Sequence, residues 1–196
     1  MPILSVLLAY LIGGIPFGLL IVHLMTGRDV RAEGSGNIGA TNVLRTSGRL
    51  AGILTLLLDI AKAWLAVWLA DRLTGGSTLW MSAAALAVLL GHAFSVWLRF
   101  KGGKAVACFI GAFAYLTPVP LIAVVLVFLL VVASTRYLSL GSIAAAALFP
   151  LACWMILHPG WPVLLSSIGA ALLIGWRHSG NIERIRAGTE RVFRFP

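Results

Sequence analysis

Apolar runs of about membrane-spanning length follow one another along this chain. A hydrocarbon layer of about 30 Å takes roughly 20 helical residues to cross. The runs lack the strict alternation of barrel strands, the other fold that can span a membrane. The sequence therefore predicts an all-α integral membrane protein of about seven transmembrane helices. They cover about residues 3–24, 51–70, 79–98, 105–117, 120–134, 141–157 and 161–176.

Composition supports the membrane assignment and argues against a nucleic-acid-binding protein. Of the 196 residues, 60% are hydrophobic and 11% are charged, more apolar surface than one soluble core can bury. The net charge of +9 falls between the apolar runs rather than on a basic patch with exposed aromatics. We expect residues 1–196 to form a single transmembrane domain. The run before Thr117 and Pro118 is short, so it is tilted, broken or partly re-entrant.

The placement of lysine and arginine predicts the orientation of the chain. Positive residues gather in the short loops on the cytoplasmic side of a membrane protein. With the N-terminus outside, the outer loops hold only Arg72, while Lys62 lies within the second run. We therefore predict an outside N-terminus and a cytoplasmic C-terminus. The inner segments would then hold Arg28, Arg31, Arg45, Arg49, Arg99, Lys101, Lys104, Arg136, Arg177, Arg184, Arg186, Arg191 and Arg194.

The first inner segment, residues 33–45, predicts an anion-binding loop. Glycines allow successive backbone N–H groups to face one concavity, and an arginine suits bidentate phosphate binding. The alternative is a turn that only caps a short helix. Its candidate ligand groups are Ser35, Gly36, Asn37, Thr41, Asn42 and Arg45.

The second inner segment places Gly102, Gly103 and Lys104 just before a predicted helix. The N-terminus of a helix attracts anions, and Lys104 would complete a phosphate site there. The spacing is not that of a P-loop. The alternative, anchoring of the inner loops by positive charge, explains the paired glycines poorly.

Further candidates lie in the later inner segments. Ser142 begins one predicted helix, where a plain N-cap is the alternative. His178 and Asn181 share a face of a short helix after the last run, where the alternative is interfacial anchoring by arginines.

Three polar residues fall inside the apolar runs. Asp59 and Lys62 are spaced to pair with each other, and a salt bridge explains them at least as well as catalysis does. His92 is either a substrate donor or a histidine satisfied by its neighbours. The two cysteines, Cys108 and Cys153, lie in apolar runs without a zinc-binding pattern, so we predict packed thiols and no metal.

The motifs together resemble one family, the bacterial acyl-phosphate:glycerol-3-phosphate acyltransferases, the PlsY family. The resemblance runs in order over nearly the whole chain. The matching segments are YLIGGIPFG at 10–18, SGNIGATN at 35–42 with Arg45, LDIAK at 58–62, GH at 91–92, FKGGK at 100–104, SLGSI at 139–143, and His178 with Asn181, Ile182, Arg184 and GTE at 188–190. SGNIGATN and FKGGK are a highly specific pair. Gly14 and Ser179-Gly180 depart from the usual pattern and affect local contacts.

The resemblance implies seven helices with active-site loops facing the cytoplasm of a bacterial inner membrane. It implies transfer of a fatty acyl group from acyl phosphate to the 1-hydroxyl of glycerol 3-phosphate, giving lysophosphatidic acid and phosphate, the first acylation of phospholipid synthesis. The resemblance implies no metal, cofactor or nucleic acid. It implies contact with membrane lipid and a functional link to the enzyme that makes acyl phosphate. It does not decide whether the protein forms a homodimer. Ser35, Arg45, Lys104 and His178 would be catalytic. The substrate-binding residues would be Gly36, Asn37, Thr41, Asn42, His92, Gly102, Gly103, Ser142 and Asn181.

Two other functional classes compete with this interpretation. A transporter for a phosphorylated solute could also use glycine-rich anion sites, but it predicts a polar path across the membrane. Here the polar groups gather on one predicted side. A purely structural subunit leaves the glycine-rich loops without explanation.

Overall fold

The computed structural model describes residues 1–193, which form helices joined by turns and loops. Arg194, counted above among the inner basic residues, lies outside them. The chain divides into two compact units, Met1–Leu116 and Thr117 onward. The expectation of one domain over residues 1–196 stays a prediction.

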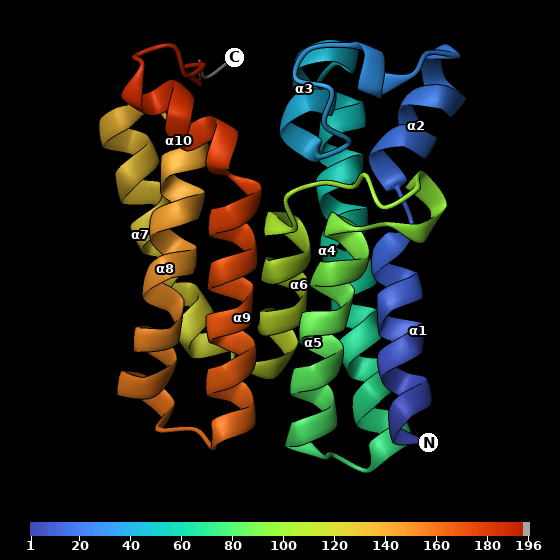
Figure 1. Ribbon diagram of the computed structural model, residues 1–196, viewed down its shortest axis with the longest axis vertical. Helices are drawn as coiled ribbons and strands as arrows, with labels where there is room; N and C mark the ends of the chain where they lie inside the picture. The colour runs from blue at the N-terminus through green and yellow to red at the C-terminus, as the bar shows by residue number, and fades with distance from the viewer. Residues whose placement is uncertain (194–196) are drawn as a thin grey trace. The chain divides into compact units, whose positions relative to one another are not determined.

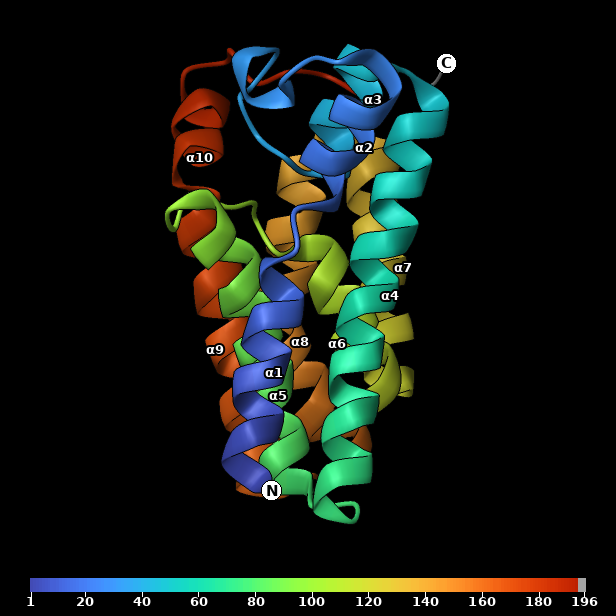
Figure 2. The same cartoon turned by 90° about the vertical axis from the view of Figure 1, so that its right-hand side faces the viewer.

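Unit 1 is a bundle in which α1, α5 and α6 pack around the long helix α4 (Figures 1 and 2). At the contact of α1 with α5, a Cβ on Gly91 would meet the backbone of Tyr10 and Gly14. Such small residues let two membrane helices approach closely. Its helices are α1 (Pro2–Gly14), α2 (Phe17–Thr26), η1 (Val30–Ala32), α3 (Ala40–Ser47), α4 (Arg49–Thr74), α5 (Thr78–Ala93), η2 (Val96–Leu98) and α6 (Val106–Leu116).

The first apolar run is broken between α1 and α2. Pro16 has no N–H and ends the regular hydrogen bonding of α1. Polar side chains from other elements bind the carbonyl groups that the break releases. Ser95 Oγ donates to Gly14 O at 2.6 Å, and Lys62 Nζ donates to Ile15 O at 2.7 Å. The break is therefore a built feature, since the carbonyl groups of Gly14 and Ile15 both have buried partners.

One end of unit 1 carries the segments that the sequence singled out. Figure 1 shows α2 and α3 at the end opposite the N-terminus, with the α4–α5 turn at the other end. An apolar cluster of Ile21, Val22, Val30, Ile38 and Val43 holds α2, η1 and α3 together. This cluster fixes the glycine-rich loop between η1 and α3 against the helices.

Unit 2 consists of antiparallel helices with a short helix at one end. α8 packs against both α7 and α9. Figure 1 shows α10 at the end of this unit opposite the α8–α9 turn. The helices are α7 (Pro118–Thr135), α8 (Leu138–Leu157), α9 (Trp161–Arg177) and α10 (Ser179–Arg186).

Five helical stretches of the described residues are long and apolar enough to cross a membrane. They correspond to predicted runs one, two, three, five and six. The fourth run forms α6, whose 11 residues reach about half of a layer of about 30 Å. The seventh forms α9, with 17 residues. The helical class is confirmed, while the count of seven crossings stays a prediction.

Candidate active site

The loop before α3 is organised around the buried side chain of Asn42. Its amide nitrogen Nδ2 lies 2.9 Å from Asn37 O, 3.2 Å from Glu33 O and 3.3 Å from Val30 O. Its oxygen Oδ1 accepts the Ser35 N–H at 2.8 Å. Both ends of the amide are thus used within the loop. We infer that Asn42 shapes the loop; a direct contact with substrate stays a prediction.

Two further features fix the shape of this loop. Gly34 has φ +61°, and a Cβ there would overlap Asn42 Oδ1. Asn37 Oδ1 accepts the Gly39 N–H at 2.8 Å, in the turn that leads into α3. Before the loop, hydrogen bonds from the side chain and backbone of Arg31 lower the pKa of Asp29 to about 2. That carboxylate caps η1.

Four of the predicted ligand residues of this loop are exposed on the surface. Ser35, Gly36, Thr41 and Arg45 are exposed, and Arg45 lies in the last turn of α3. Hydroxyl groups and a guanidinium around a glycine-rich backbone are groups that bind phosphate. The structure therefore brings these four predicted residues into one segment that an anion can reach.

The second predicted segment has a strained backbone. Arg99, Phe100 and Ala105 have φ values of 51°, 63° and 62°, uncommon for residues other than glycine. Such conformations persist where the surrounding structure enforces them, often at functional sites. Ala105 is buried, directly precedes α6, and accepts the Phe109 N–H at 2.7 Å. Lys104 is thus placed just ahead of the N-terminus of α6.

Gly102 and Gly103 use their N–H groups within the protein. Gly102 donates to Ala93 O at 3.1 Å, and Gly103 donates to His92 O at 3.0 Å. These bonds tie the segment to the end of α5. Their predicted part in substrate binding stays a prediction, but the contact with α5 already explains why two glycines stand there.

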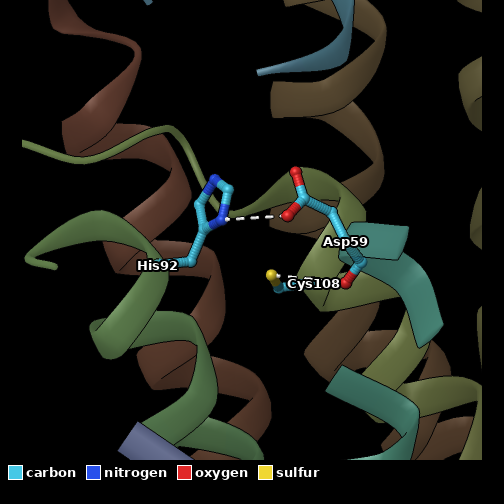
Figure 3. Close-up of side chains that lie close together, drawn as sticks. All are labelled: Asp59, His92 and Cys108. Carbon is cyan, nitrogen blue, oxygen red and sulfur yellow. Dashed lines mark hydrogen bonds and ion pairs between the residues drawn. The ribbon is translucent and has the colours of Figure 1, made fainter. Parts of the chain in front are cut away.

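A buried charged cluster lies behind this segment. Lys62 Nζ is 2.7 Å from Asp59 Oδ1 and 3.2 Å from His92 Nδ1. Cys108 lies close to Asp59 and His92, as Figure 3 shows. Asp59, His92 and Cys108 offer ligand atoms within 4.8 Å of one another. However, the lysine ammonium already faces the carboxylate and the imidazole. We therefore interpret the cluster as an ion pair with a histidine, not as a metal site.

In unit 2, Glu190 gathers three side chains. Its Oε1 accepts Asn181 Nδ2 at 2.6 Å and Ser139 Oγ at 2.8 Å, and its Oε2 accepts Arg184 Nε at 2.8 Å. Burial raises the pKa of this carboxyl, but the hydrogen bonds from Asn181, Ser139 and Arg184 outweigh it, so the pKa lies below its usual value. The carboxylate therefore fastens α10 to the start of α8.

The other two predicted residues of unit 2, His178 and Ser142, each contact a backbone carbonyl four residues earlier. His178 is buried, and its Nδ1 lies 2.8 Å from Ile174 O. Because a carbonyl only accepts, Nδ1 carries the proton there, and Nε2 is the acceptor of the neutral ring. Ser142 Oγ donates to Leu138 O at 2.8 Å on α8. Ser142 therefore lies within the first turns of the helix that it was expected to begin.

Comparison with known proteins decides the family. The family model described as "Glycerol-3-phosphate acyltransferase" matches residues 3–188. The chain belongs to the glycerol-3-phosphate acyltransferase family. The predicted family is thereby confirmed, and the protein is an acyltransferase.

Curated relatives and solved structures agree with the family assignment. The acyltransferase is 46% identical to the glycerol-3-phosphate acyltransferase of Desulforamulus reducens, over 93% of this chain and 90% of that protein. It is 48% identical to that of Trichlorobacter lovleyi, over 95% and 94%. A crystal structure of PlsY (YgiH), described as an integral membrane glycerol 3-phosphate acyltransferase in its glycerol 3-phosphate form, matches with a TM-score of 0.92 and 37% identity. That match covers 98% of this chain and 96% of the other. The membrane class of the acyltransferase is confirmed.

Two residues that fasten α10 to α8 were not identified from the sequence. Ser139 and Glu190 were not among the predicted site residues, although Glu190 binds the predicted Asn181. A signal existed, because Glu190 is one of only six acidic residues and stands in an arginine-rich tail. The roles of the individual predicted residues in catalysis and binding stay predictions.

Proposed function

We propose that this protein transfers a fatty acyl group from acyl phosphate to the 1-hydroxyl of sn-glycerol 3-phosphate. The products are lysophosphatidic acid and inorganic phosphate. The observation that carries the proposal is the close match, with a TM-score of 0.92, to an acyltransferase solved in its glycerol 3-phosphate form. A second solved form of PlsY, described as its lysophosphatidic acid form, matches with a TM-score of 0.90 and 35% identity.

The reaction needs positioning and charge neutralisation more than a protein nucleophile. The hydroxyl oxygen attacks the acyl carbonyl carbon and forms the ester bond. The bond from that carbon to the phosphate oxygen breaks, and phosphate leaves with the electron pair. A phosphate oxygen of a substrate takes the hydroxyl proton. Because acyl phosphate is already activated, the proposed reaction uses no metal and no cofactor.

The four residues predicted to be catalytic each fit a part of this chemistry. Arg45 and Lys104 would neutralise the phosphate groups, and the exposed Ser35 hydroxyl would donate a hydrogen bond to one of them. His178 would hold the attacking hydroxyl group through its acceptor Nε2. The remaining proposed substrate-binding residues are Gly36, Asn37, Thr41, Asn42, His92, Gly102, Gly103, Ser142 and Asn181.

We further propose that the protein acts in the bacterial inner membrane with these segments on the cytoplasmic side. In unit 1, Arg28, Arg31, Arg45 and Arg49 lie at the end that carries α2 and α3, whereas Arg72 lies near the α4–α5 turn. That asymmetry supports a cytoplasmic α2–α3 end. The cytoplasm would also supply glycerol 3-phosphate and the enzyme that makes acyl phosphate.

A donor comparison with purified protein tests the proposed reaction. Palmitoyl phosphate with glycerol 3-phosphate should yield lysophosphatidic acid. Palmitoyl-coenzyme A in place of palmitoyl phosphate, or glycerol in place of glycerol 3-phosphate, should yield little product. Product formation from the coenzyme A thioester alone would refute the proposed donor. Uptake of glycerol 3-phosphate into vesicles without acylation would support the transporter class instead.

Two lysines of the FKGGK segment offer a matched test of charge neutralisation. Lys104→Ala should lower kcat by about 100-fold or more, as the loss of a group that stabilises transition-state charge typically does. Lys101→Ala removes an exposed lysine three residues earlier and should keep kcat within about 3-fold. Near-normal turnover of Lys104→Ala would contradict the mechanism.

A further inference from the structure

Two buried charged side chains of unit 1, Asp59 and Lys62, have no role in the proposed reaction, and both lie close to His92, a proposed substrate-binding residue. Asp59, Lys62 and His92 form a chain of contacts, and their side chains are exposed by only 2%, 3% and 4%. Asp59 Oδ1 lies 2.7 Å from Lys62 Nζ. The same oxygen lies 3.8 Å from His92 Nδ1, a pair that Figure 3 joins with a dashed line. Charges inside a membrane span are costly and are retained where they serve a function. A salt bridge alone does not explain why a histidine joins the pair.

On one side the chain of contacts reaches the break between α1 and α2. Lys62 Nζ donates to Ile15 O at 2.7 Å, directly before Pro16. Ser95 Oγ, from the turn after α5, donates to the neighbouring Gly14 O. Lys62 therefore binds α4 to the break in the first span with the same ammonium group that faces Asp59 and His92.

At its other end, the chain of contacts reaches the segment that carries Lys104. The His92 carbonyl oxygen accepts the Gly103 N–H at 3.0 Å, and Ala93 O accepts the Gly102 N–H at 3.1 Å. A Cβ at Gly103 would overlap the His92 ring at Nε2, and a Cβ at Gly102 would overlap His92 O. The glycine pair thus lies directly on His92, through its ring and its backbone. His92 therefore determines where Gly103 lies, and with it the position of Lys104, the next residue along the chain.

We propose that Asp59 and Lys62 are positioning residues, which act through His92 to hold the FKGGK segment in place. The inference rests on the proposed function, in which Lys104 neutralises phosphate charge. Asp59 fixes the Lys62 ammonium, Lys62 fixes the His92 ring, and His92 supports Gly102 and Gly103. Asp59 and Lys62 touch no substrate in this arrangement; they act through the segment that presents Lys104.

The test combines turnover with amide hydrogen exchange in the full-length protein. Lys62→Met keeps the length of the side chain and removes the ammonium. It should lower kcat by at least about 10-fold and speed exchange of the Gly102 and Gly103 amides by a similar factor. Asp59→Asn with Lys62→Met removes both charges, so it avoids an unpaired buried carboxylate and should show the same two changes. Ser82→Ala, at a buried position on α5 ten residues before His92, is the control and should change neither.

Each outcome decides the proposal. Loss of turnover with unchanged exchange at Gly102 and Gly103 would overturn it, because Lys62 would then act on substrate directly. Faster exchange with normal turnover would also overturn it, because the segment would not need this support. If the wild-type protein turned over no acyl phosphate, the proposed function would fail, and the exchange measurement would still decide whether the three residues hold the segment.

Discussion

At the scale of single residues, Gly34 shows how closely the first loop is constrained. Its φ of +61° is one that side-chain-bearing residues rarely adopt, and a Cβ would also overlap Asn42 Oδ1. Gly27 has a similar φ of +71°, but nothing lies within 4 Å of its Cβ position. Substitutions at these two glycines therefore distinguish two effects. Both introduce backbone strain, but only the substitution at Gly34 also disturbs Asn42.

We predict that Gly34→Ala lowers kcat/KM by about 50-fold or more, whereas Gly27→Ala keeps it within about 3-fold. Backbone strain of about 1–2 kcal/mol is common to both substitutions. Only the first displaces the amide that organises the loop. Steady-state kinetics of the two variants in parallel checks this. Equal losses would mean that the loop tolerates displacement of Asn42.

The sequence indicated which polar residues the loop contains, but not which of them bind within the protein. Ser35, Arg45 and Asn42 all looked like phosphate ligands, because each can bind an anion. In the structure the Asn42 amide binds Val30, Glu33, Asn37 and Ser35 within the protein. Sequence spacing cannot show which polar side chain turns inward, since that depends on the packing of η1 against α3.

At the scale of elements, hydropathy located the spans but not the break in the first of them. Residues 3–24 were predicted as one helix, whereas α1 ends at Gly14 and α2 begins at Phe17. An average over a window of apolar residues is insensitive to one proline. Pro16 was the local signal, but the partners that make the break stable, Lys62 and Ser95, come from distant parts of the chain.

Glu190 fastens α10 to α8, and we predict that this contact is lost in acid. The pKa of the folded protein's carboxyl lies below its usual value near 4.5. The contact therefore stabilises the fold above pH about 4.5. The stabilisation disappears as the pH falls through the lowered value, because the neutral acid no longer attracts Arg184 as strongly.

Thermal unfolding in detergent checks the contribution of Glu190. Glu190→Gln should melt several degrees below the wild type at pH 7, and the gap should close as the pH falls below about 4.5. Arg184→Ala, at a side chain that is 45% exposed, should cost less, as exposed pairs do. A gap that stayed constant with pH would show that the charge of Glu190 does not hold α10.

At the scale of the whole molecule, the sequence predicted the helical membrane class correctly from the apolar runs. It could not predict how α6, with only 11 residues, completes a bundle with α4 and α5. Close contacts such as that of Gly111 with the backbone of Ile60 depend on which helices meet. The hydropathy of a single span does not indicate which other helices it packs against, because helix pairing is a tertiary property.

We predict that the α4–α5 turn faces the outside and that α10 faces the cytoplasm. A cysteine at Gly76 should react with a membrane-impermeant maleimide in intact cells, whereas a cysteine at Gly188 should react only after permeabilisation. Cys108 and Cys153 are buried and should give no background. The reverse labelling pattern would overturn the predicted orientation.

Direct transfer of the acyl group between two substrates is the central claim. The most direct measurement follows lysophosphatidic acid and phosphate together in one reaction of the purified protein with palmitoyl phosphate and glycerol 3-phosphate, with intact mass spectrometry of the protein. We predict equal amounts of the two products, both dependent on glycerol 3-phosphate, and an unmodified protein mass throughout. Phosphate release without lysophosphatidic acid, or an acyl adduct on the protein, would contradict the account.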